Sequence, residues 1–348
     1  PGVDDVSLMK AVRFHAHGGP DVLRYEEAPD PIAGPGEALV RVRACALNHL
    51  DLWQRRGMER VPIPFPHISG ADVAGEVIRS SQAEFGPGCR VMLHPGISCG
   101  RCAACLDGRD NECPKYDVLG YRSDGGYAEV VKVPVQNLIA IPDAIGFVEA
   151  AAFPLAFLTA WHMLITRAKL RAGEDVLVLG AGSGVGQAAI QIAWRHGARV
   201  FATAGTDEKL ARARQLGAYE VVNHTADDLP AKIKEFTNGR GVDVVVEHVG
   251  TATWDRSLKS LTRGGRLVTC GATTGHDAHI DLRVLFTRQI SLLGSYMGRK
   301  GELMRAAKFF FSGELRPVVD KTFPLAEAAE AHRRLEAREQ FGKLVLVV

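Results

Sequence analysis

The sequence DVLVLGAGSGVGQAAIQIAWRHG, residues 175–197, decides the fold of the second half of the chain. It begins with a continuous apolar run, typical of a strand buried on both faces, passes through closely spaced glycines and ends in a helical pattern. Glycine permits a tight turn, lets backbone amides approach a pyrophosphate and lets the helix pack closely on the sheet. The N-terminus of that helix supplies N–H donors for phosphate oxygens. We therefore expect a dinucleotide-binding turn, with a merely tight strand-to-helix turn as the alternative.

Strand-like and helical segments alternate regularly after this turn. The further strand-like runs are residues 199–205, 219–223, 242–250 and 266–271. This alternation predicts an α/β domain with a doubly wound parallel sheet, the Rossmann arrangement. Residues before about 150 form short Val-rich runs divided by Gly and Pro, which indicates a compact barrel-like β domain. The final run FGKLVLVV, residues 341–348, is expected to be a strand that rejoins this first domain.

The end of the second strand bears on the choice of dinucleotide. An Asp or Glu there would bind the ribose 2′-hydroxyl and repel a 2′-phosphate. The chain instead has TAGT at residues 203–206, and its acids Asp207 and Glu208 come at the expected start of the next helix. Lys209 and His224 could donate hydrogen bonds to a phosphate. We therefore expect NADP(H) to be favoured over NAD(H). The expected cofactor-binding residues are Gly180, Gly182, Gly184, Val185, Gly186, Thr203, Gly205, Thr206, Lys209, His224, Gly250 and Gly271.

Four of the seven cysteines lie close together in SCGRCAACLDGRDNECP, residues 98–114, with the spacing C-x2-C-x2-C-x7-C. Four thiolates at short spacings are typical of a closed tetrahedral zinc site, which leaves no open position for a substrate. The expected ligands of one structural Zn²⁺ per subunit are Cys99, Cys102, Cys105 and Cys113. A reduced lobe without metal is the alternative. Cys89 and Cys270 are expected to be buried strand residues.

Composition excludes several classes of partner. The formal net charge is +2 and no basic tract is present, so neither nucleic acid nor an anionic membrane is expected as a partner. The longest apolar stretch, residues 150–165, contains Pro154 and falls short of the roughly 18 residues of a membrane span, which favours a buried helix. The first residues, PGVDDVSL, lack the pattern of a secretory signal. A cytoplasmic location is therefore expected, where clustered cysteines favour metal over disulfides.

The order of these features resembles the medium-chain dehydrogenase/reductase superfamily over nearly the whole chain. The resemblance implies a GroES-like β-barrel domain with a zinc lobe, a Rossmann domain and a C-terminal return, and it implies that the four cysteines bind structural zinc. The expected segments are residues 1–157 with the lobe at about 94–116, residues 158–292, and residues 293–348.

Alcohol dehydrogenases of this superfamily carry a second, catalytic zinc, and the resemblance locates the matching positions in this chain. Asn48 stands where the first Cys ligand is expected, Ala71 where the His is expected, and Leu155 near the third ligand. Alanine and leucine side chains cannot bind zinc. The patterns N-x-x-D at Asn48–Asp51, G-x-D at residues 70–72 and FLTAW at residues 157–161 are instead similar to the zinc-independent quinone oxidoreductase branch.

This resemblance implies an NAD(P)H-dependent oxidoreductase that transfers hydride to a quinone or an activated C=C bond without catalytic zinc. The residues expected at the reaction are Asn48, Asp51 and Thr159, with Trp53 and His67 shaping the substrate pocket. One alternative is a zinc-dependent alcohol dehydrogenase with relocated ligands. Its candidate ligands are Cys45, His49, His67 and Asp72. A second alternative is a non-enzymatic NADPH-binding protein.

The substrate class is a small molecule whose identity the motifs do not define. The segment RQISLLGSY, residues 288–296, resembles the edge strand that pairs subunits in this superfamily. A long apolar edge strand is usually covered. A homodimer is therefore expected, with a homotetramer as the alternative.

Overall fold

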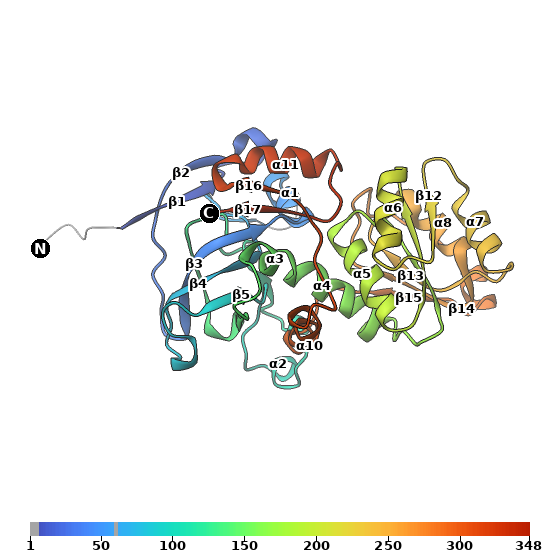
Figure 1. Cartoon of the computed structure of the whole chain (residues 1–348), viewed down its shortest axis with the longest axis horizontal. Helices are drawn as coiled ribbons and strands as arrows, with labels where there is room; N and C mark the ends of the chain where they lie inside the picture. Colours follow the sequence, from blue (N-terminus) through green and yellow to red (C-terminus); the bar gives the residue numbers. More distant parts are fainter. Residues whose placement is uncertain (1–6, 59–61) are drawn as a thin grey trace, which may run out of the picture. The chain divides into compact units, whose positions relative to one another are not determined.

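The computed structural model describes residues 7–58 and 62–348, so most of the segment PGVDDVSL considered as a possible signal lies outside the described residues. The chain divides into two compact units. Unit 1 comprises Pro1–Leu155 with Arg299–Val348, and unit 2 comprises Ala156–Gly298. The boundaries expected from the sequence were placed after residues 157 and 292. Figure 1 shows the elements of each unit, which are described separately below.

Unit 2 is built on a six-stranded sheet in the order β12-β11-β10-β13-β14-β15, and all five strand pairs are parallel. The strands are β10 (Asp175–Val178), β11 (Arg199–Ala204), β12 (Glu220–Asn223), β13 (Val242–Glu247), β14 (Leu261–Thr269) and β15 (Ser291–Gly294). In chain order this is 3-2-1-4-5-6, the Rossmann arrangement, with its switch point between β10 and β13. The predicted α/β fold is confirmed.

Helices cover both faces of this sheet, because right-handed crossovers run in opposite directions on the two sides of β10. Figure 1 shows α5 and α6 on one side of the strands and α7 and α8 on the other. The helical elements associated with unit 2 are α4 (Pro154–Trp161), the π-helical segment η5 (His162–Arg167), α5 (Gly184–Arg195), α6 (Asp207–Gln215), α7 (Leu229–Phe236), α8 (Thr251–Ser260) and α9 (Leu282–Thr287).

The apolar run that opens the glycine motif becomes the centre of this unit. All four residues of β10 are buried, and Leu177 packs with Phe201 and Val245 of the neighbouring strands in one core. A strand covered by helices on both faces needs apolar side chains in both directions, which is why this sequence does not alternate. The core therefore holds the end of β10, and the turn that follows it, in a fixed place.

Unit 1 contains a seven-stranded sheet in the order β16-β17-β3-β4-β5-β9, with β8 paired to β3, and two two-stranded sheets, β1-β2 and β6-β7. The strands are β1 (Leu8–Arg13), β2 (Arg24–Pro29), β3 (Glu37–Ala46), β4 (Asp72–Arg79), β5 (Arg90–Leu93), β6 (Gly96–Ile97), β7 (Asp117–Val118), β8 (Val130–Pro134), β9 (Leu138–Ala140), β16 (Val319–Pro324) and β17 (Lys343–Val347).

The helices of unit 1 are α1 (His49–Arg56), α2 (Ala103–Leu106), α3 (Phe147–Ala152), α10 (Lys300–Phe311) and α11 (Ala328–Glu336). Short 3-10 turns are η1 (Pro20–Val22), η2 (Ala83–Phe85), η3 (Asp110–Glu112), η4 (Val135–Asn137) and η6 (Leu325–Glu327). Helix α11 packs on β17 and against α1 (Figure 1). This contact brings the C-terminal segment beside the helix that follows Asn48.

The last strand joins unit 1 as the sequence predicts. Leu346 of β17 pairs with Cys45 of β3 in an antiparallel register, and the other edge of β17 pairs with β16 in parallel. Gly342, just before β17, has φ of +100°, and a Cβ on it would lie 2.3 Å from the carbonyl oxygen of Val318. Only glycine fits such a close approach at that backbone angle. The entry of the chain into β17 is thereby fixed.

Two expectations about burial need correction, and one is confirmed. Cys89 is half-buried and precedes β5, while Cys270 is half-buried and follows β14, so neither is a buried strand residue. Cys89 lies one residue before β5 and Cys270 one residue after β14, and the apolar pattern of the sequence did not define these strand ends. The stretch 150–165 is helical as predicted and is interrupted near Phe153. Among the described residues, no helix has the length and apolar character needed to cross a membrane.

Candidate functional site

The glycine-rich turn lies where β10 ends and α5 begins. Gly180 has φ of +57°, in the left-handed region that favours glycine. A Cβ on Gly186 would lie 2.2 Å from the carbonyl oxygen of Gly180, so only glycine lets the helix start this close to the strand. Ser183 caps the helix, because its hydroxyl accepts a hydrogen bond from Gly186 N at 2.8 Å. The first turn of α5 thus presents backbone N–H groups to an anion, in the manner of a pyrophosphate site. The same turn contains Gly182, Gly184 and Val185.

The end of β11 lies beside this turn and carries no acidic residue. Thr203 is buried, and its hydroxyl accepts a hydrogen bond from Gly180 N at 3.1 Å, so it fastens the glycine turn to β11. Thr206 caps α6 by accepting a hydrogen bond from Lys209 N at 3.3 Å. A Cβ on Gly205 would lie 3.4 Å from the His224 ring nitrogen Nε2. The structure therefore brings Gly205 and His224 together, and Thr203 acts on the turn.

A buried acid holds the loop after β13, and the sequence prediction missed it. Glu247 is fully buried and accepts hydrogen bonds from the backbone of Val249 at 2.7 Å and Gly250 at 3.0 Å, and from the Ser257 hydroxyl at 2.6 Å. These donors satisfy the carboxylate and fix Gly250, which has φ of +99°. An acid within the apolar run VVVEHVG, residues 244–250, was the signal that could have revealed it.

His248 joins this loop to the glycine turn. Its Nε2 lies 2.8 Å from the carbonyl oxygen of Leu179, and its ring lies next to Gly180. Burial lowers the pKa of His248, so the ring is neutral and Nε2 donates its proton to Leu179 O. Gly271, which follows β14, is packed against the backbone of the same histidine. A Cβ on Gly271 would lie 3.1 Å from the carbonyl oxygen of His248. Gly250 and Gly271 thus lie on the same edge of the sheet as the glycine turn.

Thr159 of α4 offers a further polar atom in unit 2. Its side chain is 5% exposed, and its hydroxyl has no hydrogen-bond partner among residues 7–58 and 62–348. A buried hydroxyl without a partner costs about 1–3 kcal/mol, so a bound group that accepts from it or donates to it would be favoured. This orphaned hydroxyl and the glycine cradle both fit a dinucleotide cofactor.

The cysteine lobe brings its four sulfur atoms together. The Sγ atoms of Cys99, Cys102, Cys105 and Cys113 all lie within 4.8 Å of one another, and none of these cysteines forms a disulfide. Zn–S bonds of about 2.3 Å in a tetrahedron place the sulfur atoms about 3.8 Å apart. The donor set therefore fits zinc.

The lobe also supports the start of α10. The Asp110 carboxylate accepts hydrogen bonds from Lys300 N at 3.0 and 3.2 Å, and Arg299 donates to Glu112 at 3.3 Å. A carboxylate at a helix N-terminus satisfies free N–H groups and is favoured by the helix dipole. Closing the lobe around a metal would therefore hold a helix start as well as a loop.

Asn48 and Asp72 lie in a buried polar cluster at the start of α1 and β4. The Asn48 side-chain nitrogen donates to Asp72 Oδ2 at 3.0 Å, and Leu155 N donates to Asp72 Oδ1 at 2.8 Å. The Lys343 ammonium donates to Asn48 Oδ1 at 2.6 Å and to Asp72 Oδ2 at 3.0 Å. Ala71 adjoins Asp72 in the chain and is 1% exposed. The structure thus brings the Asn48 amide and the backbone N of Leu155 to the carboxylate that follows Ala71, and it adds Lys343, which the sequence prediction missed.

Asp51 lies next to this cluster and receives a second chain of hydrogen bonds. Its Oδ2 accepts from Asn48 N at 2.7 Å and from the Tyr127 hydroxyl at 3.1 Å. Tyr127 lies 3.2 Å from His332 Nε2, and His332 Nδ1 lies 3.1 Å from Arg55 Nη1. Arginine can only donate, so His332 accepts at Nδ1 and donates from Nε2 to the Tyr127 oxygen. Arg55 therefore donates to His332, His332 donates to Tyr127, and Tyr127 donates to Asp51.

Burial dominates the titration of these groups. It raises the pKa of Asp51 to about 6, although the hydrogen bond from Asn48 and the charge of Lys343 oppose the shift. It lowers the pKa of His332 to about 3, and the nearby Arg55 charge lowers it further. His332 is therefore neutral near pH 7, as the hydrogen-bond directions require. Tyr127, whose pKa burial raises well above its ordinary value, keeps its proton.

The other expected site residues of unit 1 are Trp53 and His67, and their contacts involve other residues. Trp53 is half-buried on α1, with its ring 6.4 Å from that of His49. His67 is fully buried, its Nε2 lies 3.0 Å from the carbonyl oxygen of Gly120, and its ring packs edge-on against Phe14. Within residues 7–58 and 62–348, the four clustered cysteines form the only group of three or more potential metal ligands. The relocated set of Cys45, His49, His67 and Asp72 is therefore not assembled.

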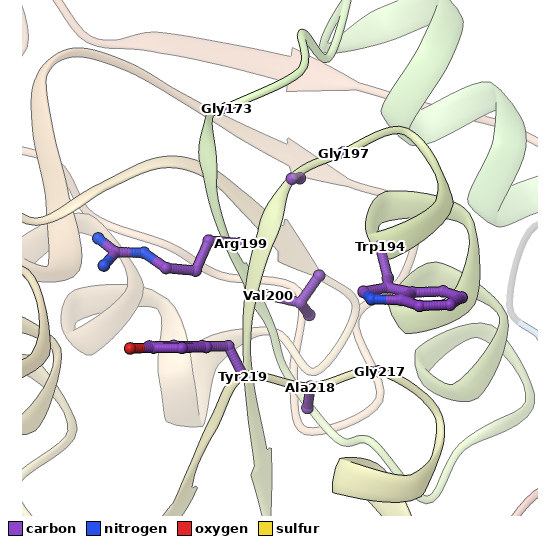
Figure 2. Close-up of a pocket in the computed structure, with 9 residues that line it drawn as sticks. Gly173, Trp194, Gly197, Arg199, Val200, Gly217, Ala218 and Tyr219 are labelled. Atoms are coloured by element: carbon purple, nitrogen blue, oxygen red, sulfur yellow. The ribbon is translucent and has the colours of Figure 1, made fainter.

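A pocket of about 570 Å³ lies in unit 2 where the strands begin, at the end of the sheet opposite the glycine turn (Figure 2). Its lining comes from segments where strands begin: Val200 of β11, and Tyr219, which precedes β12, together with Trp194 near the end of α5. Arg199 borders it, but its guanidinium is held by Asp175 at 2.7 and 2.9 Å. Ligands of open α/β sheets bind where strands end, so this pocket is separate from the predicted cofactor edge.

Comparisons with known proteins bear on the family. The chain matches "Alcohol dehydrogenase GroES-like domain" over residues 34–143 and "Zinc-binding dehydrogenase" over residues 184–312. It is 32% identical to a quinone oxidoreductase of Pongo abelii, with 98% of each chain covered. It is also 33% identical to an alcohol dehydrogenase of Geobacillus stearothermophilus, with 94% of this chain and 96% of the relative covered.

The chain belongs to the medium-chain dehydrogenase/reductase superfamily. A solved structure described as an NAD-dependent alcohol dehydrogenase superposes with a TM-score of 0.95 at 47% identity, covering 98% of this chain and 100% of that one. Membership in the superfamily makes the chain an oxidoreductase that uses a nicotinamide cofactor, and it confirms the GroES-like and Rossmann architecture. The relatives include both quinone oxidoreductases and alcohol dehydrogenases, so the superfamily alone leaves the reaction open.

The raised pKa of Asp51 predicts a pH dependence of stability. In the unfolded chain an Asp titrates near pH 3.9, whereas folded Asp51 titrates near pH 6. Between these values the folded state holds a proton that the unfolded state has released, so this group's contribution to stability falls as the pH rises. Relative to Asp51→Asn, the free energy of unfolding of the wild type should decrease by up to about 3 kcal/mol between about pH 4 and pH 7.

Urea unfolding of both proteins across this range measures the difference. Asp143→Asn serves as the control, because the Asp143 side chain is fully exposed. A difference between wild type and Asp51→Asn that stays constant with pH would show that Asp51 does not titrate in this range.

Proposed function

We propose that this protein is an NAD(P)H-dependent reductase of quinones or activated C=C bonds that works without a catalytic zinc ion. One observation carries the proposal: of the three positions that match the catalytic zinc ligands of alcohol dehydrogenases, Asn48 and the backbone N of Leu155 donate to the Asp72 carboxylate, and the third, Ala71, precedes Asp72 in the chain. The Ala and Leu side chains contain no metal-binding atom, so at most one of the three positions has a side chain that could hold zinc.

The missing ligands bear on the choice of reaction. Alcohol oxidation needs a group that stabilises an alkoxide, which a metal ion provides in zinc enzymes. Reduction of an enone or a quinone builds up a delocalised enolate or phenolate, which needs only hydrogen bonding and a proton. A bound nicotinamide would supply the hydride. The residues of this chain would then bind and orient the reactants: the N–H groups of the first turn of α5 hold the pyrophosphate, and the Thr159 hydroxyl contacts the cofactor.

In this proposal Asn48 and Asp51 have different roles near the substrate. The Asn48 amide is hydrogen-bonded to Lys343 and Asp72, so it would provide a polar surface of fixed orientation beside the substrate. Asp51 orders the start of α1 through Asn48 N. Trp53, which is half-buried, remains the proposed pocket residue of α1. His67 is fully buried, so its part in shaping the pocket would be exerted through the segment around Gly120.

We assign one structural Zn²⁺ per subunit to Cys99, Cys102, Cys105 and Cys113. The support is the approach of four sulfur atoms within 4.8 Å and the contacts of the lobe with α10. Four thiolates leave no coordination position for a substrate, so this metal would stabilise the fold and take no part in the reaction.

Turnover assays and zinc measurement on the purified protein test the reaction together. We expect NADPH-dependent reduction of enones or quinones, no oxidation of simple alcohols, and one zinc per subunit. Two zinc ions per subunit with alcohol oxidation would overturn the proposal in favour of the alcohol dehydrogenase, which the 47% identity to an NAD-dependent alcohol dehydrogenase favours. Tight NADPH binding without turnover across the panel would favour a non-enzymatic role.

The proposed preference for NADP(H) rests on the end of β11, where Gly205 and Thr206 replace an acid and His224 lies nearby. Lys209 of α6 adds a positive charge, while Asp207 and Glu208 belong to the first turn of α6. An introduced acid would repel a 2′-phosphate and bind a 2′-hydroxyl. Gly205→Asp should therefore lower the ratio of kcat/KM for NADPH over NADH by about tenfold or more, measured by steady-state kinetics. Gly205→Ala adds a Cβ without charge and is the control. An unchanged ratio in Gly205→Asp would contradict the preference.

We also propose a homodimer formed through β15, with a homotetramer as the alternative. β15 is an edge strand of the unit 2 sheet. Large apolar side chains near it are exposed: Leu282 at 65%, Phe286 at 67% and Tyr296 at 56%. An uncovered apolar edge favours pairing with a second copy. Sedimentation equilibrium should give twice the subunit mass, and Phe286→Asp should shift it toward the monomer. A wild-type monomer at micromolar concentration would contradict the dimer.

A further inference from the structure

Two cysteines of the lobe lie close enough together to form a disulfide in place of a metal site. Cys102 Sγ lies 3.5 Å from Cys105 Sγ, and Cys99 Sγ lies 4.0 Å from Cys105 Sγ. An S–S bond is about 2.05 Å long, so the Cys102–Cys105 pair needs the smaller movement of the two. Their spacing, C-x2-C, is also that of cysteine pairs that open and close disulfides in redox proteins. The arrangement that suits a metal therefore suits a disulfide as well.

This pair is accessible from solvent. Cys102 and Cys105 are half-buried, whereas Cys113 is 5% exposed. Leu106, which follows Cys105, is 75% exposed, so the lobe is open on this side. The susceptibility of a cysteine to oxidation follows its thiolate character and its exposure, and a zinc ligand is held as thiolate. A small dissolved oxidant can thus reach the pair while the lobe is folded.

We propose that Cys102 and Cys105 are an oxidation-sensitive pair: a peroxide converts them to a disulfide, two of the four metal ligands are lost, and helix α10 loses its support from the lobe. The inference rests on the structural zinc assigned above. It gives the lobe a regulatory role, in which the metal is kept only while the cysteines are reduced. Hydroquinones, the products of the proposed quinone reduction, release peroxide when dioxygen reoxidises them, so the reaction is itself a source of the oxidant.

The chemical step consumes one peroxide for each disulfide. One thiolate attacks a peroxide oxygen, the O–O bond breaks, and a sulfenic acid forms as hydroxide leaves. The second thiolate attacks the sulfenic sulfur, the S–S bond forms, and a second hydroxide leaves. The two sulfur atoms lose an electron pair, which the peroxide oxygens gain. A dithiol can return this electron pair, so the modification is reversible.

The disulfide would release the loop between Cys105 and Cys113, residues 106–112. In the zinc form both ends of this loop are bound to one metal ion. In the oxidised form Cys105 is bonded to Cys102, and the shared metal no longer joins it to Cys113. Opening a closed loop increases its conformational entropy. The loop would then leave the conformation in which it contacts α10.

This loop holds the start of α10 through two contacts. The Asp110 carboxylate accepts hydrogen bonds from Lys300 N at 3.0 and 3.2 Å, and Arg299 donates to Glu112 at 3.3 Å. The first N–H groups of a helix have no partner within the helix, so loss of the Asp110 contact removes an acceptor that the helix cannot replace itself. The first turn of α10 would therefore open more often.

The far end of α10 contacts the segment that leads to Asp72. Phe310 stacks on Phe153, with ring centroids 4.4 Å apart and ring planes at 10°. Leu155, two residues after Phe153, donates its N–H to Asp72 Oδ1 at 2.8 Å, and the same carboxylate accepts from the Asn48 amide. Oxidation of the lobe would therefore reach the polar groups proposed to lie beside the substrate.

Zinc release and the state of the cysteines test the chemical step on the intact protein. Treated with hydrogen peroxide, the wild type should release about one zinc ion per subunit, measured with a chromogenic chelator, and form the Cys102–Cys105 disulfide, measured by peptide mass spectrometry. A dithiol and added zinc should reverse both changes. Cys270→Ser is the control, because Cys270 lies in unit 2, and it should react like the wild type. Zinc that stays bound, or cysteines that oxidise only to sulfinic acid, would overturn the proposal.

Hydrogen exchange of α10 tests the structural consequence. In the oxidised wild type the amides of residues 300–311 should exchange about tenfold faster than in the reduced zinc form. Asp110→Ala should exchange at the faster rate before oxidation, and peroxide should then change that rate by less than about twofold. Asp107→Ala is the matched control, because Asp107 lies in the same loop but pairs with Arg109. Unchanged exchange in the oxidised wild type would overturn the link between the cysteine pair and α10.

The untreated protein separates this inference from the proposals on which it rests. An untreated subunit without zinc refutes the zinc assignment. Closure of the cysteine pair with faster exchange in α10 would then still support the switch, and cysteines that stay reduced would overturn it. If the protein contains zinc but reduces neither enones nor quinones, the proposed reaction fails, while zinc release and hydrogen exchange still decide whether the lobe responds to peroxide.

Discussion

The pairing of the last strand with β3 is the constraint on which unit 1 depends. β17 is the final strand in sequence, yet it lies between β16 and β3 in the sheet, so the sheet is complete only when the chain end returns. The same pairing places Lys343 beside Asn48 and Asp72, which come from residues far earlier in the chain. The polar cluster therefore cannot form before the end of the chain is in place. The pairing of β17 with β3 therefore completes the sheet and also brings the Lys343 charge to Asp72.

This dependence explains what the sequence could and could not predict. The glycine-rich turn was predictable because all its determinants lie within residues 175–197, where local backbone sterics and helix capping act. The cysteine cluster was predictable for the same reason. Thr203 was predicted to be a cofactor-binding residue; what the sequence did not reveal is that its hydroxyl accepts from Gly180 N, a contact that depends on the register of two parallel strands. Local pattern does not encode that register.

The polar groups of unit 1 were harder still, because their partners are separated by long stretches of chain. Asn48 was identified from its place in a motif, but its partner Lys343 comes almost three hundred residues later. Tyr127 and His332 have no sequence signal at all, since each is an ordinary residue until folding places their side chains 3.2 Å apart. A lysine in the apolar run FGKLVLVV was a usable signal. A polar residue that interrupts an apolar pattern predicts a buried hydrogen-bond partner elsewhere in the chain, because protein interiors leave few polar groups unpaired.

The hydrogen-bond chain that ends at Asp51 also limits how a proton could reach the substrate. A chain of this kind carries protons only if each member can both receive and release one. Arg55 stands at its far end and cannot release a proton, because guanidinium keeps its proton at all ordinary pH values. Burial lowers the pKa of His332 to about 3, so this ring cannot accept a second proton near neutrality. These hydrogen bonds therefore orient the Asp51 carboxylate and do not carry protons to it.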